Sequence, residues 1–107
     1  MKRGAMNQDF GPLVELFRLL SDRTRLDILM LLSDGERNVG SLCDALSLPQ
    51  PTVSHHLGLL RMQNLIVNRR NGKQVYYGLN GHVNADQLEG ISIEFDRFQV
   101  RVSGRDA

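Results

Sequence analysis

The order of apolar and polar residues predicts two helices in the first third of the chain. Residues 24–33 are apolar on most sides, which is typical of a central buried helix, and Asp34 and Gly35 would end it. Ser21 and Asp22 precede this helix and offer side-chain oxygens that can cap it. A first helix of about three turns is predicted before them. Its apolar stripe consists of Phe10, Leu13, Val14, Phe17 and Leu20.

A pair of shorter helices joined by a tight connection follows. Residues 39–46 have one apolar face, and residues 47–49 have the length that a helix-turn-helix requires. Pro49 and Pro51 flank Gln50, and proline is tolerated in the first turn of a helix, so the next helix is predicted to begin here. Its buried side would consist of Val53, Leu57 and Leu60. The second helix of such a pair reads the major groove of DNA.

The next two apolar runs predict a β-hairpin. Residues 65–67 and 75–77 are rich in β-favouring side chains. Asn71 and Gly72 lie between them and predict a type I′ turn, in which both central residues need positive φ. Cations near this turn could reach DNA phosphates or a minor groove, as the wing of a winged helix does. These cations are Arg69, Arg70 and Lys73.

Period-two alternation near the end of the chain predicts a second hairpin. A turn at Asp96 and Arg97 would place Phe95 opposite Phe98 and put six apolar side chains on one face. Because Asp-Arg is not a favoured turn pair, a bulged or longer continuous strand is the alternative. A two-stranded unit needs a partner, either the first helix of its own subunit or a second subunit. The predicted dimer interface comprises Phe10, Leu13, Val14, Phe17, Ile93, Phe95, Phe98 and Val100.

Charge distribution separates the middle of the chain from its ends. The net charge is only +1, from 13 Lys and Arg against 12 Asp and Glu. No acidic residue lies between Asp44 and Asp86, whereas four basic residues do, so one face is predicted to be basic. These four residues are Arg61, Arg69, Arg70 and Lys73. The arrangement favours double-stranded DNA as a partner.

Length and composition fit one small globular protein of 107 residues. We expect a disordered tail at residues 1–8, a winged helix-turn-helix domain at 9–80 and a C-terminal segment of strands at 81–107. The fold class is therefore mainly α with a small β component. Neither a membrane-length apolar run nor a signal peptide is visible, which favours the cytoplasm and no membrane partner. A single cysteine, Cys43, excludes an intrachain disulfide.

Three segments resemble the ArsR/SmtB family of bacterial winged-helix repressors. They are residues 20–29 (LSDRTRLDIL), residues 46–61 with Ser54-His55-His56-Leu57, and the wing that ends in Tyr76-Tyr77. The resemblance implies a homodimeric transcription factor that binds a palindromic operator, often represses its own operon and releases DNA when an inducer binds. The sequence names no inducer.

The metal sites of that family are not matched. An arsenic-type site resembles three cysteines at the positions of Asn38, Gly40 and Cys43, and only the last is a cysteine here. One thiolate cannot supply a soft three-coordinate site. The zinc and nickel sensors use carboxylate and histidine ligands on a C-terminal helix, where this chain has only His82 and Asp86. We therefore predict no metal and no cofactor.

The leading hypothesis is a dimeric, autoregulatory DNA-binding repressor and not an enzyme. One alternative is a metal- or thiol-responsive repressor that uses Cys43 or His82, and another is a winged helix that binds protein. The position of Cys43 on the apolar face of its helix favours a small buried apolar residue over a reactive thiol, and His56 could pack beside the wing. The predicted DNA-binding residues are Gln50, Pro51, Thr52, Ser54, His55, His56, Arg61, Arg69, Arg70 and Lys73.

Overall fold

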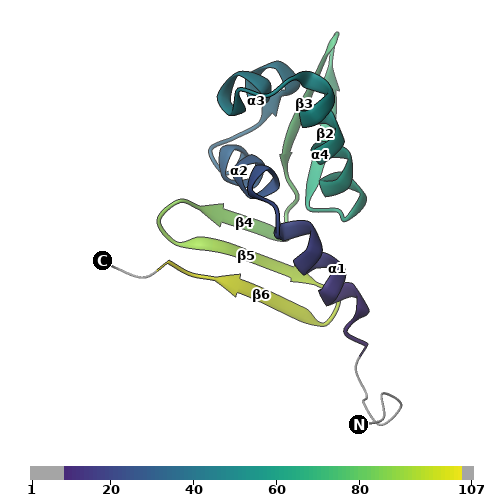
Figure 1. Ribbon diagram of the computed structural model, residues 1–107, viewed down its shortest axis with the longest axis vertical. Coiled ribbons are helices and arrows are strands. Elements are labelled where there is room, and N and C mark those ends of the chain that lie inside the picture. The colour runs from purple at the N-terminus through teal and green to yellow at the C-terminus, as the bar shows by residue number, and fades with distance from the viewer. Residues whose placement is uncertain (1–8, 105–107) are drawn as a thin grey trace.

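The structure, a computed structural model, describes residues 9–104. Four helices and six strands lie in this part of the chain. Figure 1 shows the β2–β3 hairpin at one end of the molecule, the β4–β5–β6 sheet at the other, and α2 between them. The elements are α1 (Gly11–Leu20), α2 (Arg23–Leu32), β1 (Arg37–Asn38), α3 (Val39–Leu46), α4 (Gln50–Met62), β2 (Ile66–Asn71), β3 (Gln74–Leu79), β4 (Val83–Asp86), β5 (Gly90–Phe95) and β6 (Phe98–Val102).

Helix α2 is the centre of the core, as its apolar pattern predicts. Ile28 and Leu29 are completely buried, and α2 contacts the three other helices as well as β3 and β4. The same core includes Leu57 of α4 and Ile93 of β5, so the helices and the C-terminal sheet share one apolar interior. None of the helices within residues 9–104 is long and apolar enough to span a bilayer.

Side-chain caps define where two of the helices begin. The carboxylate of Asp22 accepts a 3.0 Å hydrogen bond from the Arg25 amide at the start of α2. The side-chain oxygen of Asn38 accepts a 2.8 Å bond from the Ser41 amide at the start of α3. Ser47 ends α3 in the left-handed conformation, with φ of 55°, and the chain turns directly into α4. These caps hold the helix-turn-helix in place.

The wing is a three-stranded sheet with the order β1-β3-β2. Its hairpin is confirmed, but the predicted turn is wrong by one residue. Asn71 pairs with Gln74, so the two loop residues are Gly72 and Lys73, and only Gly72 has positive φ. Glycine at the first of two central positions suits a type II′ turn, which leaves Asn71 free to continue the strand.

The C-terminal segment forms an antiparallel sheet with the order β4-β5-β6. The predicted hairpin is confirmed, with Phe95 opposite Phe98 and Ile93 opposite Val100, and its two-residue turn begins at Asp96 with φ of 51°. The bulged and continuous-strand alternatives are therefore wrong. The third strand, β4, was not predicted. The rings of Phe10 and Phe98 lie 5.8 Å apart, so the hairpin docks on α1 of its own subunit.

Candidate DNA-binding surface

Helix α4 divides into a buried side and an exposed polar side. Val53, Leu57 and Leu60 are at most 1% exposed and attach the helix to the core. The opposite side carries amide, hydroxyl and imidazole groups, which suit both base edges and phosphates. All of the following are exposed: Gln50, Pro51, Thr52, Ser54, His55 and Arg61. The structure thus brings six of the predicted contact residues to one solvent-facing surface.

Part of this surface is a shallow open groove along α4. The groove runs beside Gly58, which has no side chain, and ends near Met62, which is 78% exposed. Ser54, His55 and Arg61 line it, so hydroxyl, imidazole and guanidinium groups follow one another along the helix. These neighbouring hydrogen-bond donors can contact DNA phosphates or base edges in a DNA groove.

His56 differs from its neighbour because it is half-buried and has a partner in α2. A guanidinium nitrogen of Arg25, Nη1, lies 3.1 Å from His56 Nδ1. Since arginine can only donate, Nδ1 accepts, and the neutral ring carries its proton on Nε2. Arg25 also donates to the Leu19 carbonyl of α1 over 2.6 Å. The ring of His56 thus contacts Arg25 of α2, and its packing beside the wing stays a prediction.

Asp22 completes this cluster at the start of α2. Its carboxylate lies 3.9 Å from the Arg25 guanidinium and accepts a hydrogen bond from the Arg25 backbone amide. The hydrogen bond from the Arg25 backbone amide, together with the nearby positive charge, lowers the pKa of Asp22 below its usual value, although partial burial opposes the shift. The Arg25 side chain, only 14% exposed, therefore links α1, α2 and α4.

The wing cations do not share one environment. Arg69 forms an ion pair with Glu36, with its Nη2 2.7 Å and its Nε 2.8 Å from the same carboxylate oxygen, and its guanidinium lies over the Tyr76 ring. The hydrogen bond to Glu36 and its charge raise the pKa of Arg69. This partner is 33 positions away in the sequence, and no local signal could have identified it.

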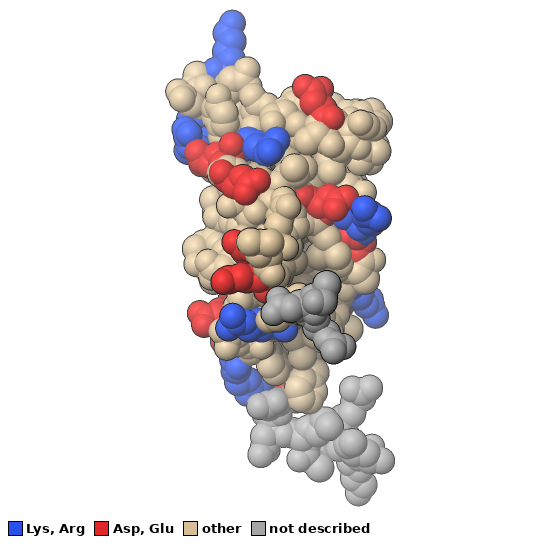
Figure 2. Space-filling model, turned by 90° about the vertical axis from the view of Figure 1, so that its left-hand side faces the viewer, with Lys and Arg blue, Asp and Glu red and all other residues tan. Residues whose placement is uncertain are grey.

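Arg70 and Lys73 are exposed, and neither forms a side-chain hydrogen bond or ion pair with the rest of residues 9–104. Arg70 faces the opposite side of β2 from Arg69, and Lys73 lies in the turn. Figure 2 shows a basic side chain that projects at the wing end of the molecule. The tip therefore presents two cations whose charge is not compensated locally.

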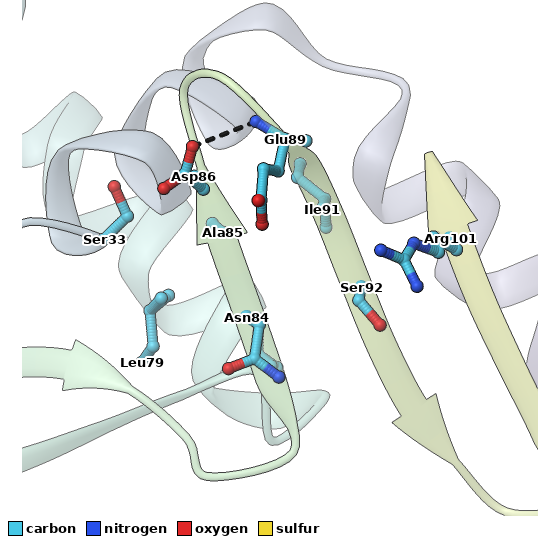
Figure 3. Close-up of a pocket in the computed structure, with 11 residues that line it drawn as sticks. Ser33, Leu79, Asn84, Ala85, Asp86, Glu89, Ile91, Ser92 and Arg101 are labelled. Atoms are coloured by element: carbon cyan, nitrogen blue, oxygen red, sulfur yellow. Dashed lines mark hydrogen bonds between the residues drawn. The ribbon is translucent and has the colours of Figure 1, made fainter. Parts of the chain in front are cut away.

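The residues considered for sensing lie apart from one another. Cys43 is half-buried against the core, Asn38 is committed to its cap, and His82 lies in the turn before β4. Asp86 accepts a hydrogen bond from the backbone amide of Glu89 at a cleft of about 500 Å³, which the C-terminal sheet lines together with Ser33 and Leu79 (Figure 3). Within the described residues, no three His, Cys, Asp or Glu side chains are grouped to hold a metal ion.

The predicted dimer residues fall into three groups. Phe10, which precedes α1, is 41% exposed, and Val14 and Phe17 of α1 are 46% and 51% exposed, which leaves an apolar row on the surface. The half-buried group is Leu13, Phe95, Phe98 and Val100. Ile93 is completely buried, because β4 pairs beside it and the core covers its face. It is therefore not available to a partner, and we omit it from the interface.

Comparison with known proteins identifies the family. The family model described as bacterial regulatory protein, arsR family, matches residues 22–67. The transcriptional repressor SdpR of Bacillus subtilis is 36% identical over 73 residues, which cover 68% of this chain and 81% of SdpR. This chain belongs to the ArsR family. The family consists of transcriptional regulators and not enzymes, and the predicted resemblance is confirmed.

Other ArsR relatives share the same region. The arsenical resistance operon repressor of Escherichia coli is 48% identical over 73 residues, or 67% of this chain and 62% of that repressor. The chain thus spans less than two thirds of that relative's length. The β4–β5–β6 sheet lies outside the residues that the family model matches.

Solved structures confirm the winged helix-turn-helix fold. HlyU from Vibrio cholerae has a TM-score of 0.65 at 34% identity, covering 71% of this chain and 83% of HlyU. A homodimeric winged helix-turn-helix DNA-binding domain from Mycobacterium bovis has a TM-score of 0.64 at 30% identity, covering 70% and 75%. ArsR-family repressors bind DNA, and the second of these structures is itself a homodimer.

Proposed function

We propose that this ArsR-family protein is a homodimeric repressor that binds a palindromic operator and represses its own promoter. The observation that carries the proposal is the exposed polar side of α4 together with two cations at the wing tip, Arg70 and Lys73, that have no partner in the described part of the chain. Because bacterial DNA lies in the cytoplasm, we propose that the protein acts there.

The proposed contacts divide by what each group can recognise. Gln50, Thr52, Ser54 and His55 would meet base edges and phosphates in the major groove, and Arg61 would meet the backbone. Arg70 and Lys73 would neutralise flanking phosphates. Arg69 would hold the wing through Glu36, and His56 would hold α4 through Arg25.

Two copies would place their α4 helices about one DNA turn apart in successive major grooves. Bound in this way, the dimer would block access of RNA polymerase to the promoter. The exposed row of Phe10, Val14 and Phe17, together with the half-buried apolar residues of the C-terminal hairpin, supports a seam formed by α1 and that sheet. Burial of such an apolar patch is the usual driving force for dimers.

No observation favours a metal- or thiol-responsive function over this one. Cys43 packs as a small apolar residue, His82 lies in the turn before β4, and Asp86 is the last residue of that strand. We therefore propose repression without the thiolate or histidine–carboxylate sites that the family resemblance suggests. An inducer of another class would act by changing the spacing of the two α4 helices.

A titration of the protein against its own upstream DNA tests the proposal. Binding should be tight, should weaken steeply as salt rises, and should not respond to zinc, arsenite or an oxidant. A matched duplex with one half-site scrambled should bind far more weakly. Binding with little salt dependence would instead favour the protein-interaction module, and release by arsenite or an oxidant would make Cys43 a sensor. Gln50→Ala should alter the preference among operator variants.

A further inference from the structure

Strand β6 forms the outer edge of the C-terminal sheet. The order β4-β5-β6 leaves one side of β6 without a partner among residues 9–104, whereas β4 contacts α2 (Figure 1). Proteins usually protect an exposed edge with proline, a bulge or an inward charge. Residues 98–102 (FQVRV) contain no proline, and their pairing with β5 is regular. The edge is thus open to another strand.

The two faces of β6 differ. Phe98 and Val100 are half-buried on the apolar face, and Gln99 and Arg101 point to the opposite one. Val102 belongs to the apolar face but is 60% exposed. Phe98 contacts Phe10, so the exposed row on α1 continues onto this edge. An apolar surface therefore runs from α1 to the end of β6.

The hairpin determines which backbone groups of β6 face outward. A two-residue loop closes on a hydrogen-bonded pair, here Phe95 and Phe98, and such pairs alternate along the ladder. The amide and carbonyl groups of Phe98, Val100 and Val102 therefore point toward β5. Those of Gln99 and Arg101 point toward the open edge.

We propose that β6 pairs antiparallel with β6 of a second copy, about a twofold axis at Val100. In this arrangement Gln99 of each copy exchanges two hydrogen bonds with Arg101 of the other, and the two Val100 residues face each other as a non-hydrogen-bonded pair. The contact is isologous, because each residue meets its own reciprocal partner. The result is one six-stranded sheet across the dimer.

Charge selects this register over its neighbours. Because only Gln99 and Arg101 direct backbone amide and carbonyl groups to the open edge, a symmetric pairing that uses them must have its twofold axis at Gln99, Val100 or Arg101. A centre at Gln99 would set Arg97 opposite Arg101, and a centre at Arg101 would set two copies of that arginine opposite each other. Like charges directly opposed destabilise a sheet. Only the centre at Val100 opposes arginine to a neutral side chain.

The pairing also accounts for the exposed end of β6. It places Phe98 of the second copy beside Val102, so the two apolar faces become continuous. The α1 row of each copy then borders the shared sheet, which extends the buried surface beyond the strands themselves. This inference specifies the seam of the proposed dimer and rests on that function.

Cysteine cross-linking tests the register in the otherwise complete protein. In a Cys43→Ser background, Val100→Cys should form a disulfide-linked dimer under mild oxidation, because a non-hydrogen-bonded pair lies about 4.5 Å apart between Cα atoms. Gln99→Cys and Arg101→Cys are the matched controls. In the proposed register, each of these cysteines would lie two residues along the strand from the same cysteine of the second copy. Cross-linking should therefore be about tenfold slower or more.

A second measurement uses the unmodified protein and avoids any folding defect of the variants. Amide hydrogen exchange at dimer concentrations should protect Gln99 and Arg101 as strongly as Val100, whereas a free edge would leave both amides fast. Light scattering separates the possible failures. A dimer without the Val100→Cys cross-link and without that protection overturns the edge pairing alone, and a monomer that also fails to bind the two-half-site operator overturns the proposed function.

Discussion

The two kinds of wing cation predict different responses to salt. Arg70 and Lys73 at the tip have no ion-pair partner within residues 9–104, whereas Arg69 is neutralised by Glu36. If each tip cation contacts one phosphate, a dimer loses four contacts when both become alanine. The slope of log K against log salt should then become shallower by about 3.6, since each contact contributes about 0.9.

That slope change converts into a large loss of affinity. At about 0.15 M salt, a slope shallower by about 3.6 corresponds to roughly a thousandfold weaker binding relative to the wild type, with the two proteins converging near about 1 M. Fluorescence anisotropy with a labelled operator, measured at five or six salt concentrations, gives the slope directly. The loss should be similar for operator and unrelated DNA, because phosphates carry no sequence information.

The matched control removes the ion pair without changing the net charge. Arg69→Ala combined with Glu36→Ala should leave the salt slope within about one unit of the wild-type value, because no phosphate contact is lost. An equal drop in slope for this variant and the tip variant would refute the assignment of separate roles. An unchanged slope in the tip variant would remove the wing from the DNA interface.

Three further predictions concern stability and the helix contacts. Gly90→Ala should lower the melting temperature, because the backbone has φ of +106° there and the new Cβ would overlap the Val102 carbonyl oxygen. Gly58→Ala lies in open space on α4 and should stabilise the folded protein by about 0.5–1 kcal/mol. Equal shifts of the melting temperature in the two variants would contradict this. Because the pKa of Asp22 is lowered in the folded protein, its carboxylate stabilises the fold at pH values above 3.8, the usual pKa of aspartate. This stabilisation is lost as the pH falls through the lowered pKa. Asp22→Asn keeps a capping oxygen, so its unfolding free energy in urea should fall less than that of the wild type on acidification. Nitrogen-15 NMR should find neutral His56 protonated on Nε2, and a proton on Nδ1 would refute its contact with α2.

Local patterns in the sequence were sufficient to predict most elements. Helical spacing and capping residues predicted α1 to α4 within one or two residues, and strict alternation predicted the pairing of Phe95 with Phe98. Strand β4 was missed because only Val83 and Ala85 alternate within its four residues. The wing turn was displaced because Asn71 pairs in the strand, a choice that depends on Gln74 opposite it.

The candidate surface was predictable in composition but not in its internal contacts. Exposure of Gln50, Thr52 and Ser54 follows from helical periodicity alone. The ion pair between Glu36 and Arg69 and the contact of His56 with α2 join residues more than thirty positions apart. Such pairs depend on tertiary packing, which no local period encodes. These two contacts separate Arg69 and His56, which hold the wing and α4 in place, from the predicted contact residues that can face DNA.

Strand β1 has a mechanical consequence for the wing. It pairs with β3 at only two positions, Tyr76 and Tyr77, so the hairpin is three-stranded at its middle and a two-stranded ribbon from Val75 to the turn. Two-stranded ribbons are weakly stabilised and twist more readily than wider sheets. The middle of the hairpin is therefore stiffer than its tip, and the tip at Gly72 and Lys73 is compliant. A compliant tip can follow phosphates whose positions vary with groove width, while the rigid α4 tolerates no such variation at the half-site.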